Sequence, residues 1–123
     1  MQHAGRTEIT TLSERTRGKL LRIFVDEDDR YEGKPLYMAI VDALKAAGFA
    51  GATVLKGIEG YGIRKTVHAA RTFDMSTNMP ILIEVIEEDS KIAAFMPALR
   101  AMVSEGLITL ESLELMRISR GSS

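Results

Sequence analysis

Glycine and cationic side chains are concentrated in residues 46–71, and this segment limits the fold of the chain more than any other. Glycine permits positive φ and the close approach of another group. Successive backbone N–H groups in glycine turns bind anions, and neighbouring cations add charge-assisted hydrogen bonds. The segment predicts either a plain hairpin turn with a solvated basic tip or an anion-binding loop. In the second case its ligand-binding residues are Gly57, Gly60, Gly62, Arg64, Lys65 and His68.

The composition excludes several kinds of site. The chain has no cysteine, so disulfides, thiolate metal sites and cysteine nucleophiles are ruled out. Its length of 123 residues fits one domain, and its net charge of −1 gives no overall field that attracts nucleic acid. Aromatic residues make up only 6%, with no tryptophan, so a base-stacking surface is poorly supplied. We therefore expect one domain that does not bind nucleic acid.

The first 18 residues are polar and lack a periodic pattern. We expect residues 1–18 to form a mobile tail in front of a domain that spans residues 19–120. No stretch approaches the roughly 20 apolar residues of a membrane span, and the N-terminus lacks the apolar core of a signal peptide. The expected location is therefore the cytoplasm, without insertion into a membrane.

From Lys19 onward, the hydrophobic pattern predicts alternating strands and helices. Strand composition marks residues 20–25, 52–58, 81–86 and 107–118, with a further extended stretch at residues 67–73. Pro35 fits the first position of a helix and Gly48 its C-terminal cap. A second helix is expected to begin with Asp89 or Ser90 as its cap and to end at Gly106. Pro97 should kink or break this helix.

The resulting order, β-α-β-β-α-β, predicts an α+β fold of the ferredoxin-like type. Both helices would cover one face of a four-stranded antiparallel sheet. The other face would carry apolar side chains such as Leu20, Phe24, Val54 and Leu82. Because large exposed apolar patches mark interfaces, the sequence predicts an oligomer.

Several segments resemble PII signal-transduction proteins. Residues 46–54 resemble the helix that ends in glycine before a G-x-T-V strand, and residues 60–62 resemble the G-[FY]-G turn that opens the long T-loop. A narrower resemblance is to the PII-like family catalogued as domain of unknown function 190. Residues 21–24 resemble the L-R-I-[FY] strand of that family, and residues 26–29 resemble its acidic turn. Residues 33–37 resemble its G-[KR]-P-L-Y helix, and residues 50–62 resemble its string from A-G-A-T-V to G-[FY]-G.

The resemblance implies a homotrimer whose three sheets face inward around the axis. It also implies a cleft between subunits, where PII proteins bind adenine nucleotides, and a T-loop that acts as a ligand-responsive arm. Gly60 and Gly62 match the turn at the base of the T-loop, and Lys65 and His68 match cationic and polar positions just inside it.

The chain departs from PII proteins in its second phosphate-binding loop. The family pattern T-G-x-x-G-D-G-K is represented only by residues 104–109, which lack the second glycine cluster and the lysine. AMP, ADP or another small anion is therefore a better expected ligand than ATP. Residues 69–79 contain no tyrosine, so regulation by tyrosine uridylylation has no acceptor there.

No spacing in the sequence pairs a nucleophile with a base, so we assign no catalytic residue and do not expect an enzyme. The acidic residues 26–29 offer oxygen ligands for a divalent cation, but their spacing is not that of an EF-hand, and we interpret them as a solvated turn. The leading interpretation is a trimeric PII-like regulator that signals through residues 61–79. Two alternatives stay open: a ligand-independent module that docks on a membrane transporter or channel, and a small metal-binding trimer similar to the copper-tolerance relatives of the PII fold.

Overall fold

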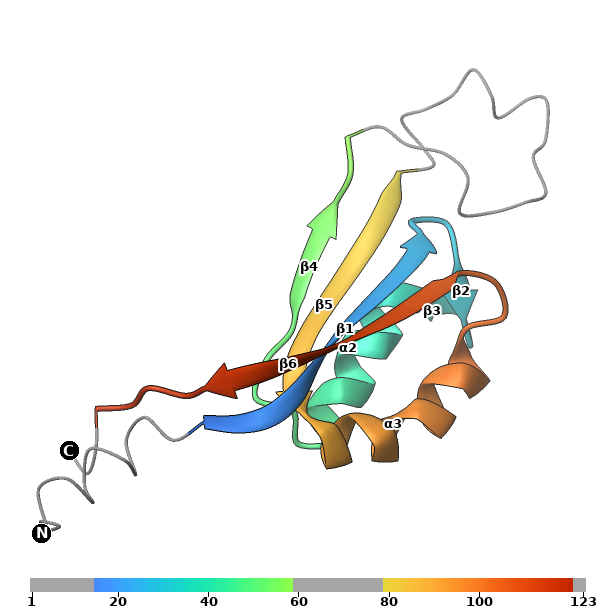
Figure 1. Cartoon of the computed structure of the whole chain (residues 1–123). Coiled ribbons are helices and arrows are strands. Elements are labelled where there is room, and N and C mark those ends of the chain that lie inside the picture. The colour runs from blue at the N-terminus through green and yellow to red at the C-terminus, as the bar shows by residue number, and fades with distance from the viewer. Residues whose placement is uncertain (1–14, 59–78, 121–123) are drawn as a thin grey trace, which may run out of the picture.

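The structure, a computed structural model, describes residues 15–58 and 79–120 (Figure 1). Its main sheet is antiparallel, with the strand order β4-β5-β1-β6. These four strands are β1 (Arg15–Asp26), β4 (Thr53–Lys56), β5 (Pro80–Glu88) and β6 (Leu107–Met116). Helices α2 (Leu36–Ala46) and α3 (Asp89–Met102) cover one face of the sheet. The predicted ferredoxin-like fold is confirmed.

Strand β1 begins earlier than the sequence pattern indicates. Residues 15–18 are already part of β1, where Arg15 pairs with Met116 and Gly18 pairs with both Leu113 and Glu88. These four residues, expected in the N-terminal tail, therefore belong to the sheet. The rest of the expected tail, and the extended stretch expected at residues 67–73, lie outside the described residues.

The core lies between the sheet and the two helices. Alternate residues of β1 and β5 point toward the helices and are buried, and so are the matching stripes of α2 and α3. Every second residue is buried in the strands, and residues three or four positions apart are buried in α2 and α3. The fold prediction depends on these two patterns. The central members of this core are Leu21, Ile23, Val25, Ile83, Val85, Ile40, Leu44, Ile92, Phe95 and Leu99.

Helix α2 ends in a glycine cap, as predicted. Gly48 adopts φ 84°, its amide donates to the carbonyl of Lys45, and the amide of Phe49 donates to the carbonyl of Leu44. This pair of bonds is the Schellman motif, which satisfies carbonyls that the helix end leaves free. Phe49 is thereby turned into the core, where its ring meets Phe95 edge-on with 5.3 Å between centroids.

Helix α3 differs from the prediction at three places, the first of which is its end, at Met102 with Val103 as the C-cap and not at Gly106. Its N-cap is Glu88, which makes no side-chain capping bond, so neither Asp89 nor Ser90 is the cap. The helix also continues through Pro97 to Met102, so of the two expected effects of Pro97, a kink or a break, the break is wrong. Pro97 and Ala93, whose carbonyl loses its helical partner, are both exposed. Water can therefore bind that carbonyl, which lowers the cost of an internal proline.

The sheet face away from the helices, called the open face below, is apolar around a charged group formed by Arg22, Glu84 and Glu111. Phe24, Leu82 and Leu55 are direct neighbours across β1, β5 and β4. Leu55, Ile86 and Leu107 keep 49%, 52% and 54% of their surface exposed. Among these side chains, Arg22 Nε donates to Glu84 Oε2 at 2.7 Å. The prediction was wrong for Val54, which pairs with the buried Ile83 and so lies on the helix side.

A small hairpin that the sequence did not predict precedes α2. It consists of β2 (Arg30–Tyr31) and β3 (Lys34–Pro35), joined by Glu32 and Gly33. Both turn residues have positive φ, 49° for Glu32 and 86° for Gly33, as in a type I′ turn. Asparagine, aspartate and glycine are preferred at the first position, because other L-residues are strained in the left-handed region. Glu32 therefore holds an unfavourable backbone conformation.

Glu32→Asn is expected to stabilise the fold by about 0.5–1 kcal/mol, because asparagine tolerates the left-handed region better than glutamate does. Urea unfolding at a fixed protein concentration measures the change. Glu32→Ala is the matched control, since it removes the carboxylate but keeps a Cβ in the strained position. An equal gain in both variants would show that the charge of Glu32, and not its backbone conformation, destabilises the turn.

Candidate functional site

The candidate site begins at the end of the sheet where the chain leaves β4 and returns to β5. Lys56, Gly57, Met79 and Pro80 lie there and are called the arm base below. The amide of Gly57 donates to the carbonyl of Pro80 at 2.8 Å, one residue beyond the last strand pair, Lys56 with Ile81. The amide of Glu27 donates to the carbonyl of Met79 at 2.9 Å. Both ends of the predicted arm are therefore fixed to the same end of the sheet, beside the turn that follows β1.

Gly57 is required at the arm base by close packing. A Cβ at this position would lie 2.7 Å from Pro80 Cγ, which is closer than carbon atoms approach. Among the described glycines, only Gly33 and Gly48 have positive φ, so Gly57 does not serve an unusual backbone angle. The structure thus gives Gly57 a structural role, and its role in ligand binding stays a prediction.

An ion pair ties the arm base to the turn after β1. Lys56 Nζ lies 2.9 Å from Glu27 Oε2. The hydrogen bond from Lys56 lowers the pKa of Glu27 below its ordinary value of 4.5. The same bond raises the pKa of Lys56 above 10.5. Lys56 is therefore occupied by a carboxylate, and any anion bound beside it would have to compete with Glu27.

The ion pair is expected to make stability depend on pH at the acid side. Because the pKa of Glu27 is lowered by folding, its contribution is present above pH 4.5 and is lost as the pH falls through the lowered value. The melting temperature of the wild type should therefore fall more steeply than that of Glu27→Gln between about pH 5 and pH 3. Glu88→Gln, which removes an exposed carboxylate at the end of β5, is the control. Parallel curves for the wild type and Glu27→Gln would contradict the role of the pair.

The acidic residues 26–29 build the turn itself. The amide of Asp28 donates to Asp26 Oδ1 at 3.0 Å, and the amide of Asp26 donates to Asp29 Oδ2 at 2.9 Å. These bonds are typical of turns in which aspartate carboxylates replace backbone acceptors. Within residues 15–58 and 79–120, no group of three or more acidic or histidine side chains is placed to hold a metal ion.

The loop between α3 and β6 reaches the same end of the sheet as the arm base. A Cβ on Gly106 would lie 2.8 Å from the carbonyl oxygen of Phe24, so glycine is needed for this backbone approach. Gly106 also belongs to residues 104–109, which take the place of the second phosphate-binding loop of PII proteins but lack its second glycine cluster and its lysine. The fold therefore places this shortened loop and the arm base near the end of β1.

A buried carboxylate marks the opposite end of the sheet. The side chain of Glu87 is only 4% exposed, and its Oε2 accepts a hydrogen bond of 2.9 Å from Arg117. Its Oε1 lies 3.4 Å from the amide of Ala50, in the loop between α2 and β4. Glu87 thus connects the segment after β6 to the loop before β4, and its burial makes the Arg117 partner important.

Five of the six predicted ligand-binding residues lie outside the described part of the chain: Gly60, Gly62, Arg64, Lys65 and His68. Sequence reasoning missed Glu27, Lys56, Glu87 and Arg117 as paired groups. The alternation in β5 held one signal, because Glu87 follows Ile81, Ile83 and Val85 on the face that packs against the helices. A charged residue in such a register position predicts a buried ion pair.

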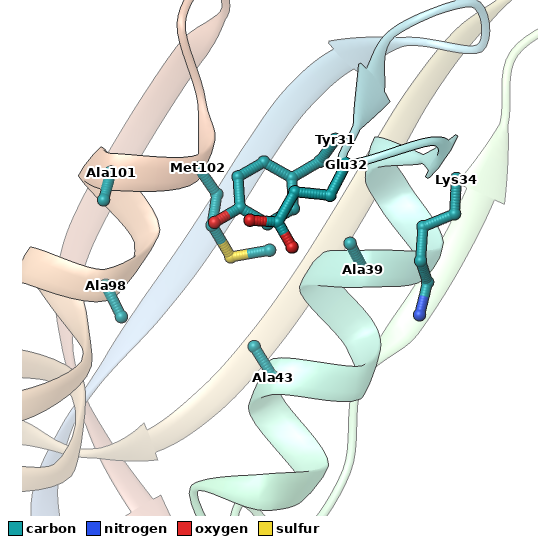
Figure 2. A pocket seen from close by; sticks show the side chains of 8 residues that line it. All are labelled: Tyr31, Glu32, Lys34, Ala39, Ala43, Ala98, Ala101 and Met102. Atoms are coloured by element: carbon teal, nitrogen blue, oxygen red, sulfur yellow. The ribbon is translucent and has the colours of Figure 1, made fainter.

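A groove of about 470 Å³ lies between α2 and α3, beside the β2–β3 hairpin (Figure 2). Its floor is formed by small side chains of both helices, and the side chains of Tyr31, Glu32, Lys34 and Met102 complete its lining. The sequence did not predict this groove, because its walls come from three separate elements.

No helix of the described residues is long and apolar enough to cross a membrane.

Comparison with known proteins identifies the family. The family model DUF190, described as "Uncharacterized ACR, COG1993", matches residues 18–115. A UPF0166 protein of Aquifex aeolicus is 41% identical over 96 residues, which are 78% of this chain and 90% of the relative. A UPF0166 protein of Methanocaldococcus jannaschii is 38% identical over 95 residues, which are 76% of this chain and 87% of the relative.

The fold is similar to that of a solved PII-like protein. The structure of CPII from Thiomonas intermedia K12, bound to ADP, AMP and acetate, matches with a TM-score of 0.53 and 18% sequence identity. The match covers 85% of this chain and 93% of CPII. With the predicted order of elements confirmed and the family model matched over residues 18–115, the chain belongs to the DUF190 (UPF0166) family.

Proposed function

We propose that this chain is a trimeric, non-enzymatic regulatory protein of the PII type. It binds an adenine nucleotide or a similar anionic metabolite between subunits, and it signals through the arm of residues 61–79. The arm base supports this proposal most directly. The amide of Gly57 donates to Pro80 and the amide of Glu27 donates to Met79, so the chain leaves and returns at the same end of the sheet. A ligand bound there would bias the arm without deforming the core.

The open face supports a trimer. Sheets that are apolar on both faces are normally covered on both faces. Strand β5 is such a strand, since Ile81, Ile83 and Val85 meet the helices while Leu82 and Ile86 point to the open face. Two further copies of the chain would cover this face. The Arg22–Glu84 pair would then be buried with it, and fixed ion pairs of this kind select one register of association.

The ligand we propose is AMP or ADP, bound by Gly57, Gly60, Gly62, Arg64, Lys65 and His68. CPII, whose fold is similar, was solved with ADP and AMP bound. The α3–β6 loop of this chain carries Gly106 but no second glycine cluster or lysine, so it offers few donors for a third phosphate.

A thermal-shift series with AMP, ADP, ATP and inorganic phosphate tests the nucleotide. AMP or ADP at about 100 times its dissociation constant should stabilise the protein by about 2.7 kcal/mol, and ATP at the same concentration by less. Arg64→Ala should lose this stabilisation. The control Arg100→Ala, an exposed residue of α3, should keep it. If none of the four compounds shifts the melting of an intact trimer, the nucleotide part is wrong. Capture of a transporter by the nucleotide-free protein, unchanged in Arg64→Ala, would then favour the ligand-independent module.

A further inference from the structure

The groove between α2 and α3 has the shape of a small-molecule site. Its volume of about 470 Å³ lies within the roughly 300–1,000 Å³ of ligand pockets. Figure 2 shows Ala39 and Ala43 on α2 and Ala98 on α3 directed into the space between the helices. Because these side chains end at Cβ, they leave room for an apolar body to lie along the floor.

The groove lining includes one negative charge that has no partner among the described residues. Glu32 makes no hydrogen bond or ion pair with any other described residue, and its carboxylate is directed over the groove (Figure 2). The cation in the lining is already neutralised, since Lys34 Nζ lies 2.6 Å from Asp42 Oδ2 and points away from the floor. The charge that a ligand meets in the groove is therefore that of Glu32.

We infer that this groove binds a small organic cation, a primary amine or guanidinium compound with a short apolar body. The cationic head would pair with Glu32, beside the ring of Tyr31, because carboxylates and aromatic faces both attract cations. The apolar body would lie on the alanine floor against the thioether of Met102, which adapts to irregular ligands.

The groove is separate from the site of the proposed function. Its residues belong to the β2–β3 hairpin, α2 and α3, which lie on the helix side of the sheet. Association through the open face would therefore leave the groove accessible. This inference does not depend on the nucleotide or on the trimer, so each can fail while the other holds.

The test is an NMR titration of the full chain with ¹³C-methyl labels on alanine and methionine. The probes are n-butylguanidinium and n-butylamine, with n-butanol and butyrate as neutral and anionic compounds of similar length. We expect saturable shifts of Ala39, Ala43, Ala98 and Met102 with the two cations only. Glu32→Gln should weaken cation binding about tenfold, which corresponds to the loss of one charge-assisted pair. Ala98→Leu, at an exposed position of α3, should fill the groove and abolish the shifts.

The control Glu114→Gln removes the same charge from β6, far from the groove in sequence and on another element, and should leave binding unchanged. The inference is overturned if butanol or butyrate shifts the same methyl groups as strongly as the cations do. It is also overturned if Glu32→Gln binds as tightly as the wild type. Shifts with a lysine-rich peptide, but with neither free cation, would assign the groove to a protein partner instead.

Discussion

Leu82→Glu is expected to elute as a monomer, whereas the wild type elutes as a trimer in size-exclusion chromatography with light scattering. Leu82 lies at the middle of the open face, opposite Phe24 on one side and Leu55 on the other. A glutamate there would place one unpaired carboxylate per subunit in an apolar interface. The cost is about 3 kcal/mol or more for each copy, which exceeds what the remaining contacts of a small interface can offset.

Ala93→Glu is the matched control, because it adds the same charge at an exposed position of α3 on the other side of the sheet. Far-UV circular dichroism should show that both variants keep the fold. A trimeric Leu82→Glu protein would contradict the assignment of the open face. A monomeric wild type would contradict the trimer itself, whatever the variants do.

Arg117→Ala is expected to lower the free energy of unfolding by about 2–3 kcal/mol. The change leaves the Glu87 carboxylate buried without its cation, and removing one partner of a buried pair typically costs about 3–5 kcal/mol. The expected loss is smaller because the Arg117 side chain is 50% exposed. Urea unfolding at one fixed protein concentration measures the change, so that association does not shift the result.

The double variant Glu87→Gln/Arg117→Ala should recover part of the loss, since an uncharged amide is less costly to bury than a carboxylate. Arg120→Ala removes the same charge three positions further along and should be nearly neutral. Equal effects of Arg117→Ala and Arg120→Ala would show that the Glu87–Arg117 contact contributes nothing to stability.

The elements that could be predicted from the sequence are those whose signal is local. Residues 81–86 of strand β5 are apolar except for Glu84, and the end of α2 is marked by Gly48, whose positive φ other residues rarely adopt. The register that places Val54 on the helix side depends on its pairing with Ile83, which composition does not encode. The continuity of α3 through Pro97 likewise depends on tertiary structure, because Pro97 and Ala93 are on the exposed side of the helix, where water can bind the freed carbonyl.

The candidate site was predictable only in part, because most of its contacts join residues that are far apart in the sequence. The glycine content predicted a plain turn or an anion-binding loop that includes Gly57, whereas the structure shows that a Cβ there would be too close to Pro80 Cγ. The Glu27–Lys56 pair joins residues 29 positions apart, through a bond that exists only after β4 is placed beside the end of β1. The groove over α2 and α3 depends on the Glu32–Gly33 turn, whose first residue is atypical for its conformation.

The Gly57–Pro80 hydrogen bond has a consequence for how such proteins diversify. It closes the sheet at the point where the chain leaves it after Gly57 and returns at Pro80. Doubling the length of a flexible insertion adds only about 0.6 kcal/mol to the cost of closing it. The β4–β5 junction can therefore accept connecting segments of different length at little cost to the sheet.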